Sequence, residues 1–215
     1  MAKAVIFDKD GVIVQSTRLH LEVWKRTFAI HNKKISLAFM RKYMMGRSAK
    51  ENIKAHLDPN IADKKMKQEL NDQLTFIRKN YRKYIEIVPG ILNFLKKLKK
   101  AKIRAALATS SRRETTDLFL DTLKLREYFN SITTSDDVTK AKPDPEIYLK
   151  AAKNLRVKPA DSVVFEDSYS GIEAAKRAGM KVVLVTTSLT KKEISNVDLS
   201  IKDFTKISIS DLRKI

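Results

Sequence analysis

Short apolar segments alternate with helical segments along this chain, and this alternation constrains its fold more than any other feature. Five segments have the length and composition of buried strands, at residues 3–8, 103–109, 131–134, 162–166 and 181–186. Helical spacing of apolar residues recurs between them, at 91–100, 113–123, 145–155 and 172–178. Strands that alternate with helices predict an α/β fold: a Rossmann-like parallel sheet with helices on both faces.

The alternation is interrupted after the first strand by a long helical stretch. Residues 15–86 contain no strand candidate, and helical patterns lie at 20–30, 36–45 and 63–87. An all-helical stretch between two strands of a parallel sheet predicts an inserted cap domain. We therefore expect a core domain of residues 1–14 and 87–215, and a helical cap domain of residues 15–86.

The composition restricts the class of protein. The net charge is +19, and residues 15–86 carry 17 basic against 7 acidic side chains. Such a surface attracts anions, although scattered lysines also fit a generally Lys-rich protein. The chain has no cysteine and no apolar run near the ~20 residues of a membrane span. We expect a monomeric, cytoplasmic protein whose partner is neither a membrane nor nucleic acid.

Polar side chains follow several of the predicted strands at the point where each strand ends. Because ligands bind beyond the carboxyl ends of parallel strands, these side chains should converge on one crevice. They are Asp8 and Asp10 after the first strand, Thr109 and Ser110 after the second, and Glu166 and Asp167 after the fourth, with Lys142 ahead of the helix at 145.

This set of side chains predicts phosphoryl transfer. The four carboxylates are hard oxygen ligands that suit Mg²⁺. Hydroxyls and the backbone amides that open a helix suit phosphate oxygens, and a lysine adds a fixed positive charge. A cation, a lysine and amides together stabilise a transferring phosphoryl group. Two aspartates then have two tasks, since one attacks phosphorus and the other transfers a proton.

Four motifs resemble the haloacid dehalogenase superfamily, in its phosphatase and beta-phosphoglucomutase-like branch with a small helical cap. They are DKDGV at 8–12, LATSS at 107–111, KAKPDP at 140–145 and VVFEDSYSGIEAAKRAGM at 163–180. The resemblance implies that Asp8 is the nucleophile and Asp10 the general acid and base. It implies that Thr109 and Lys142 bind phosphate.

The same resemblance implies the metal site. Asp167 matches the metal-binding acid, together with Asp8 and the backbone carbonyl of Asp10. Glu166 would assist directly or through water.

Matches in the predicted cap are fewer. His20, Trp24 and Lys79 stand where beta-phosphoglucomutase-like members have similar residues, and Gly46-Arg47-Ser48 resembles the cap loop that reaches the substrate. The mutases carry an arginine one residue after that serine, which holds the distal phosphate. Here the position is Ala49, with Arg47 and Lys50 as the neighbouring cations.

We therefore predict a Mg²⁺-dependent phosphatase that acts on a small phosphorylated metabolite through an aspartyl-phosphate. A beta-phosphoglucomutase that uses the same site is the main alternative. A non-catalytic protein that binds anions or nucleic acid through a basic cap is a further one. We also expect a cis peptide bond between Lys142 and Pro143, since two prolines so close to the helix at 145 restrict how Lys142 enters the crevice.

Overall fold

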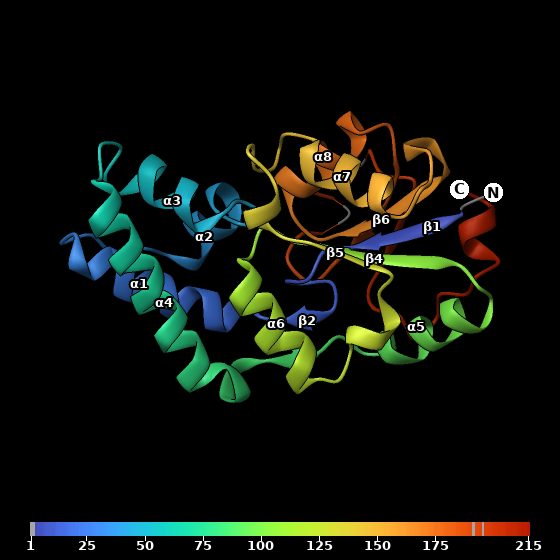
Figure 1. The fold of residues 1–215 in the computed structure, drawn as a ribbon, viewed down its shortest axis with the longest axis horizontal. Helices are drawn as coiled ribbons and strands as arrows, with labels where there is room; N and C mark the ends of the chain where they lie inside the picture. The colour runs from blue at the N-terminus through green and yellow to red at the C-terminus, as the bar shows by residue number, and fades with distance from the viewer. Residues whose placement is uncertain (1–2, 191, 195) are drawn as a thin grey trace.

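A six-stranded sheet forms the centre of the molecule (Figure 1), as seen in a computed structural model that describes residues 3–190, 192–194 and 196–215. The strand order is β5-β4-β1-β6-β7-β8, and every neighbouring pair is parallel. The strands are β1 (Ala4–Phe7), β4 (Arg104–Ala108), β5 (Ser131–Thr133), β6 (Ser162–Glu166), β7 (Lys181–Val185) and β8 (Leu199–Ile201). The α/β, Rossmann-like fold predicted from the sequence is confirmed, and the first strand lies in the interior of the sheet.

Helices cover both faces of this sheet (Figure 1). Alternate side chains of β1 enter two separate apolar clusters, as the two-residue period of a strand requires. Val5 and Phe7 pack with α5 and α6, whereas Ala4 and Ile6 pack with α7 and α8. The helices are α5 (Ile91–Lys100), α6 (Arg113–Thr122), α7 (Glu146–Asn154) and α8 (Tyr169–Arg177), with short 3-10 turns at Arg126–Tyr128, Ser135–Asp137, Pro159–Asp161 and Asp211–Arg213.

Four further helices form a block at the end of the molecule away from the two termini (Figure 1). They are α1 (Thr17–Ile30), α2 (Leu37–Tyr43), α3 (Ala49–His56) and α4 (Asp63–Tyr84). Their shared core contains Trp24, Phe28, Met40 and Met44. The chain enters and leaves the block through a two-stranded antiparallel ribbon, β2 (Val14–Gln15) and β3 (Glu86–Ile87).

Besides shifts of one to three residues at the ends of α1 and α2, the helical stretch differs from its prediction in three places. Gln15 and Glu86 lie in the ribbon, so residues 15–86 are not wholly helical. The last helix ends at Tyr84 and not at residue 87, because the chain turns there into β3. Helix α3 was not predicted; the Ser48 side chain caps its N-terminus by accepting a hydrogen bond from the Glu51 amide.

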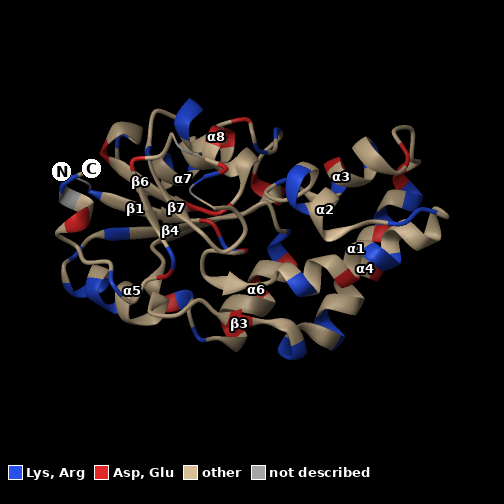
Figure 2. Cartoon of the chain, turned by 180° about the vertical axis from the view of Figure 1, so that it is seen from behind, with Lys and Arg blue, Asp and Glu red and all other residues tan. Residues whose placement is uncertain are grey.

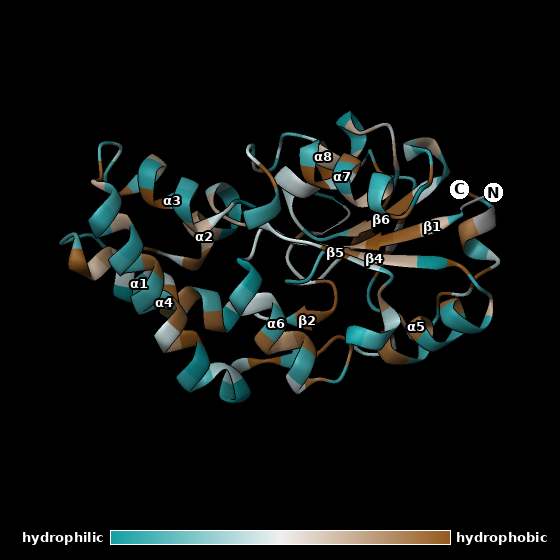
Figure 3. Ribbon diagram, in the orientation of Figure 1, coloured by the Kyte–Doolittle hydropathy of each residue, from teal (hydrophilic) through white to brown (hydrophobic). Residues whose placement is uncertain are grey.

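Hydropathy and charge follow this layered arrangement. Figure 3 shows hydrophobic residues along the strands and hydrophilic residues over much of the helices. Figure 2 shows Lys and Arg on the helices at both ends of the molecule, with acidic segments also in loops between the sheet and the helical block. Among the helices of the described residues, none combines the length and hydropathy needed to cross a membrane.

Candidate active site

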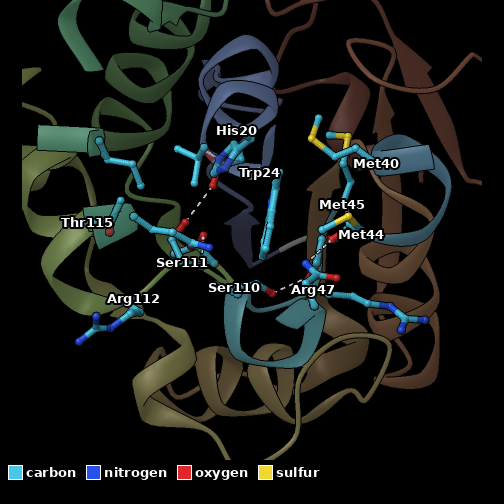
Figure 4. Close-up of a pocket in the computed structure, with 18 of the residues that line it drawn as sticks. His20, Trp24, Met40, Met44, Met45, Arg47, Ser110, Ser111, Arg112 and Thr115 are labelled. Atoms are coloured by element: carbon cyan, nitrogen blue, oxygen red, sulfur yellow. Dashed lines mark hydrogen bonds and ion pairs between the residues drawn. The ribbon is translucent and has the colours of Figure 1, made fainter. Parts of the chain in front are cut away.

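The polar residues at the strand ends face a cavity between the sheet and the helical block (Figure 4). The cavity measures about 110 Å³. Its core side includes Asp8, Asp10, Thr109, Ser110 and Asp167, as the sequence predicted, and its other side comes from α1, α2, α4 and the loop between α2 and α3.

Lys142 lies at the centre of the acidic residues. Its ammonium group lies 2.8 Å from Oδ1 of Asp8 and 2.7 Å from Oε1 of Glu166, and the side chain is fully buried. Burial disfavours the charged form, but the two carboxylates outweigh it and raise the pKa of Lys142 above its usual value. The peptide bond before Pro143 is cis, which confirms that prediction.

Glu166 uses both carboxylate oxygens on donors from the protein. Oε1 accepts hydrogen bonds from Lys142 and from the Tyr148 hydroxyl at 2.7 Å. Oε2 accepts from the amides of Asp167 and Ser168 at 2.8 and 3.0 Å, and from the Ser168 hydroxyl. Glu166 therefore orients Lys142 and the start of α8.

Three carboxylates converge closely enough to hold a metal ion. Oxygen atoms of Asp8, Glu166 and Asp167 all lie within 4.8 Å of one another, and all three residues are buried. Burial raises the pKa of Asp8 to about 7, since the nearby Glu166 and Asp10 partly cancel the opposing effect of Lys142. Burial, with Glu166 and Asp8, raises the pKa of Asp167 well above its ordinary value. This excess of negative charge, on hard oxygen donors, fits Mg²⁺.

Asp167 is positioned by a loop that the sequence did not single out. Ser188 donates a hydrogen bond to Oδ2 of Asp167, and the Thr187 hydroxyl donates to the Gly11 carbonyl at 2.6 Å. Gly11 has a φ of +80°, and a Cβ atom there would lie 1.7 Å from the same Oδ2. Because Thr187 and Ser188 follow β7, the rule that directed attention to the other strand ends could have found them.

Asp10 is held by four donors from different segments. Oδ1 accepts from Ser16 at 2.6 Å and lies 3.0 Å from Nε2 of His20. Oδ2 accepts from Ser111 at 3.0 Å and lies 3.2 Å from the Lys9 ammonium. Burial opposes ionisation, yet Lys9 and His20 hold the pKa of Asp10 well below its usual range. Lys9 and Ser16 were missed, although they lie in or beside the first motif, and Ser111 is the last residue of the LATSS motif but was given no role.

The residues that follow β4 connect the core to the helical block. Thr109 is buried, and its Oγ1 accepts a hydrogen bond from the Ser111 amide. The Ser110 hydroxyl donates to the Gly46 carbonyl at 2.6 Å, so in this structure it contacts the helical block. Gly46 has a φ of +78°, and a Cβ atom there would lie 2.3 Å from Oγ of Ser168 and of Ser170. Only glycine allows this approach.

The residues predicted for substrate contact on the helical block do not all meet at the cavity. His20, Gly46 and the buried Trp24 line it. Arg47 lines the edge of the cavity, but the residue is exposed and its side chain extends away from the cavity in Figure 4. Lys50 is exposed and lines a neighbouring cavity; Lys79 is exposed on α4 and lines neither.

The sequence itself decides the family. A model of the family described as haloacid dehalogenase-like hydrolase matches residues 5–185. The chain belongs to this haloacid dehalogenase-like hydrolase family. Within the family it is 30% identical to the validoxylamine A 7'-phosphate phosphatase of Streptomyces hygroscopicus subsp. limoneus over 207 residues, which cover 96% of each chain.

Two further haloacid dehalogenase-like relatives define the branch. The beta-phosphoglucomutase of Bacillus subtilis is 35% identical over 192 residues, or 84% of this chain and 82% of that protein. The crystal structure of a HAD hydrolase, family IA, variant 3, from Entamoeba histolytica covers 100% of both chains, with 32% identity and a TM-score of 0.86. The chain is therefore an enzyme of the phosphatase and beta-phosphoglucomutase-like branch, as the motifs predicted.

Proposed function

We propose that this enzyme is a Mg²⁺-dependent phosphatase that hydrolyses a small phosphorylated metabolite, such as a sugar phosphate, through a phosphorylated Asp8. The observation that supports it best is the buried pair of Asp8 and Lys142, 2.8 Å apart, beside a cavity that admits a substrate. Lys142 holds the nucleophile and would also contact the phosphoryl group. Lysine in this position offsets the charge that collects during phosphoryl transfer.

Asp8 and Asp167 would hold the metal, together with the backbone carbonyl of Asp10 that the family resemblance implies. Glu166 would act through water, because hydrogen-bond donors of the protein already occupy both of its oxygens. When bound there, Mg²⁺ supplies positive charge that offsets the phosphate and the carboxylates. Thr109 and the amides after β4 complete the phosphate site, where the Ser110 amide, more than its hydroxyl, is available because the hydroxyl contacts Gly46.

The reaction has two steps in this proposal. A carboxylate oxygen of Asp8 bonds to phosphorus, and the bond from phosphorus to the ester oxygen breaks. Asp10, which is ionised in the substrate-free protein and must first take up a proton, gives that proton to the leaving alcohol. Water then bonds to phosphorus, its proton passes to Asp10, and the bond between Asp8 and phosphorus breaks to release phosphate. The donors around Asp10 fix the position of its carboxylate for both proton transfers, to the leaving alcohol and from water.

A beta-phosphoglucomutase would share these steps but return the phosphoryl group to a sugar hydroxyl. It must keep a doubly phosphorylated sugar bound, a task that suits a bidentate arginine. Ala49 lines the cavity and offers no charge, and Arg47 extends away from it. These two residues favour hydrolysis. A purely binding role is disfavoured, because binding alone does not require the Asp8, Asp10 and Lys142 arrangement.

We also propose that residues 15–86 act as a cap that opens for substrate, with the β2–β3 ribbon as the hinge. The contacts from Ser110 to Gly46 and from Ser170 to the Met45 carbonyl would then hold the closed form.

Phosphate release from a panel of phosphorylated metabolites tests the function. We expect at least one ester to be hydrolysed with Mg²⁺, no release in chelator, and no release by Asp8→Asn. Release in chelator, or full activity of Asp8→Asn once deamidation is excluded, would overturn the proposal.

A further inference from the structure

The side of the cavity formed by the helical block is mostly apolar. The residues that line it there include Val23, Trp24, Met40, Met44, Leu74 and Ile77. Five of these six are themselves buried, so the wall is a continuation of the apolar cores of the helical block. A wall of this kind binds apolar surface. It offers no hydrogen bonds to replace those that hydroxyl groups or charges lose when they leave water.

Positive charge does not point into this part of the cavity from the described residues. Arg47 and Arg112 line its edge, and Figure 4 shows both side chains extending away from Trp24 and Ser110. The His20 imidazole is already paired with Asp10. A second phosphate or a carboxylate on the substrate would therefore lose its hydration without gaining a cationic partner.

One polar group in the wall stands out because it lacks a partner. Asn52 is 2% exposed and lines the cavity. Its Nδ2 donates to the Met44 carbonyl at 3.0 Å, which fixes the orientation of the amide. Oδ1 is buried and accepts no hydrogen bond from the described residues. Leaving a buried acceptor unpaired costs free energy, so a donor from a bound molecule would satisfy it.

We propose that the substrate is a phosphomonoester with a single anionic group, whose alcohol part packs an apolar surface against Trp24, Met44 and Leu74 and donates one hydroxyl hydrogen bond to Oδ1 of Asn52. This rests on the phosphatase function proposed above. Asn52 is then a residue that determines specificity, and a polyhydroxylated or doubly phosphorylated sugar is a poorer substrate.

Matched esters test the substrate class with the wild-type enzyme. Cyclohexylmethyl phosphate and glucose 6-phosphate share a six-membered ring and a primary ester, so they differ mainly in polarity. We expect kcat/KM to be at least about tenfold higher for cyclohexylmethyl phosphate, and glucose 1,6-bisphosphate to be the poorest of the three, because its second phosphate is buried unpaired. A preference for glucose 6-phosphate or for the bisphosphate overturns the inference and leaves the phosphatase function standing. No hydrolysis of any ester would instead count against the function itself.

Ring-hydroxylated cyclohexylmethyl phosphates test Asn52. We expect one positional isomer to exceed the unsubstituted ester in kcat/KM, by about tenfold or more, because the hydroxyl fills the vacant acceptor. In Asn52→Leu, of similar size, that advantage should vanish, so that the favoured isomer and the unsubstituted ester have similar kcat/KM values. Equal kcat/KM for all isomers in the wild type would contradict the role of Asn52, whether or not the variant folds. If the hydroxylated isomer keeps its higher kcat/KM in a folded Asn52→Leu variant, that result would also contradict the role of Asn52.

Discussion

The Lys9 ammonium lies 3.2 Å from Oδ2 of Asp10, although Lys9 is only 3% exposed and stands between the two aspartates of the first motif. It also lies 5.5 Å from the centre of the Phe119 ring. A lysine is costly to bury, so its position beside Asp10 indicates that it holds that carboxylate.

Lys9→Met keeps the length and burial of the side chain and removes its charge. If Lys9 positions Asp10, kcat should fall on the order of tenfold with little change in KM, since misplacing a catalytic group acts on the chemical step. Steady-state kinetics check this, and the melting temperature shows whether the variant is folded. Unchanged kcat in a folded Lys9→Met would show that Ser111, Ser16 and His20 suffice.

Asp10→Asn tests the proton transfer. An amide cannot donate or accept the proton at this position, so turnover should fall about 10²–10⁴-fold, the usual contribution of a general acid or base. Phosphate release under saturating substrate measures it. The matched control is Asp117→Asn in α6, which pairs with Arg126 and does not line the cavity, and which we expect to keep wild-type activity. Near-normal turnover of Asp10→Asn would assign the proton transfer to another group.

Metal binding should depend on pH in a defined direction. Burial raises the pKa of Asp8 from its ordinary 3.8 to about 7, and it raises the pKa of Asp167 as well. A raised carboxyl pKa stabilises the fold at low pH, and this contribution disappears as pH rises through the folded pKa. Mg²⁺ requires the ionised carboxylates.

The rise in melting temperature caused by Mg²⁺ should therefore be larger at about pH 8 than at about pH 5. Thermal unfolding with Mg²⁺ and with chelator measures it. Asp167→Ala should abolish the Mg²⁺ effect, whereas Glu127→Gln, on the exposed surface, should keep it. An Mg²⁺ effect that is equal at both pH values, or that survives in Asp167→Ala, would place the metal elsewhere.

Ala49→Arg tests hydrolysis against mutase chemistry. The wild type should release phosphate faster than it converts beta-glucose 1-phosphate to glucose 6-phosphate in the presence of glucose 1,6-bisphosphate. The added guanidinium offers a bidentate partner for a distal phosphate, so the ratio of mutase to phosphate release should rise. A coupled assay measures both rates. Wild-type conversion much faster than phosphate release would make the enzyme a mutase.

The parts of the fold that could be predicted are those with a long or repeated pattern. Five buried strands and most helices follow from runs of apolar residues at strand or helix spacing. Strand β8 and the ribbon β2–β3 are two or three residues long and partly exposed, too short to produce a pattern. Helix α3 has only two buried residues, too few to give a helical pattern of apolar residues, so its position depends on tertiary contacts.

The site divides in the same way. Asp8, Asp10, Thr109, Lys142 and Asp167 could be found because each lies at a strand end or in a motif. Contacts made across the fold were not visible in the sequence: Ser188 with Asp167, Ser111 with Asp10, and Ser110 with Gly46. Such contacts join residues far apart in the chain, and no local pattern records them.

Chemical trapping of the phosphorylated enzyme tests the central claim most directly. Borohydride reduces an acyl phosphate to an alcohol, which would convert a phosphorylated Asp8 to homoserine. Enzyme quenched with borohydride during turnover of a good substrate should show homoserine at position 8 by peptide mass spectrometry, and enzyme without substrate should not. Asp8 unmodified during turnover, or reduction at a different carboxylate, would contradict the assignment of Asp8 as the nucleophile.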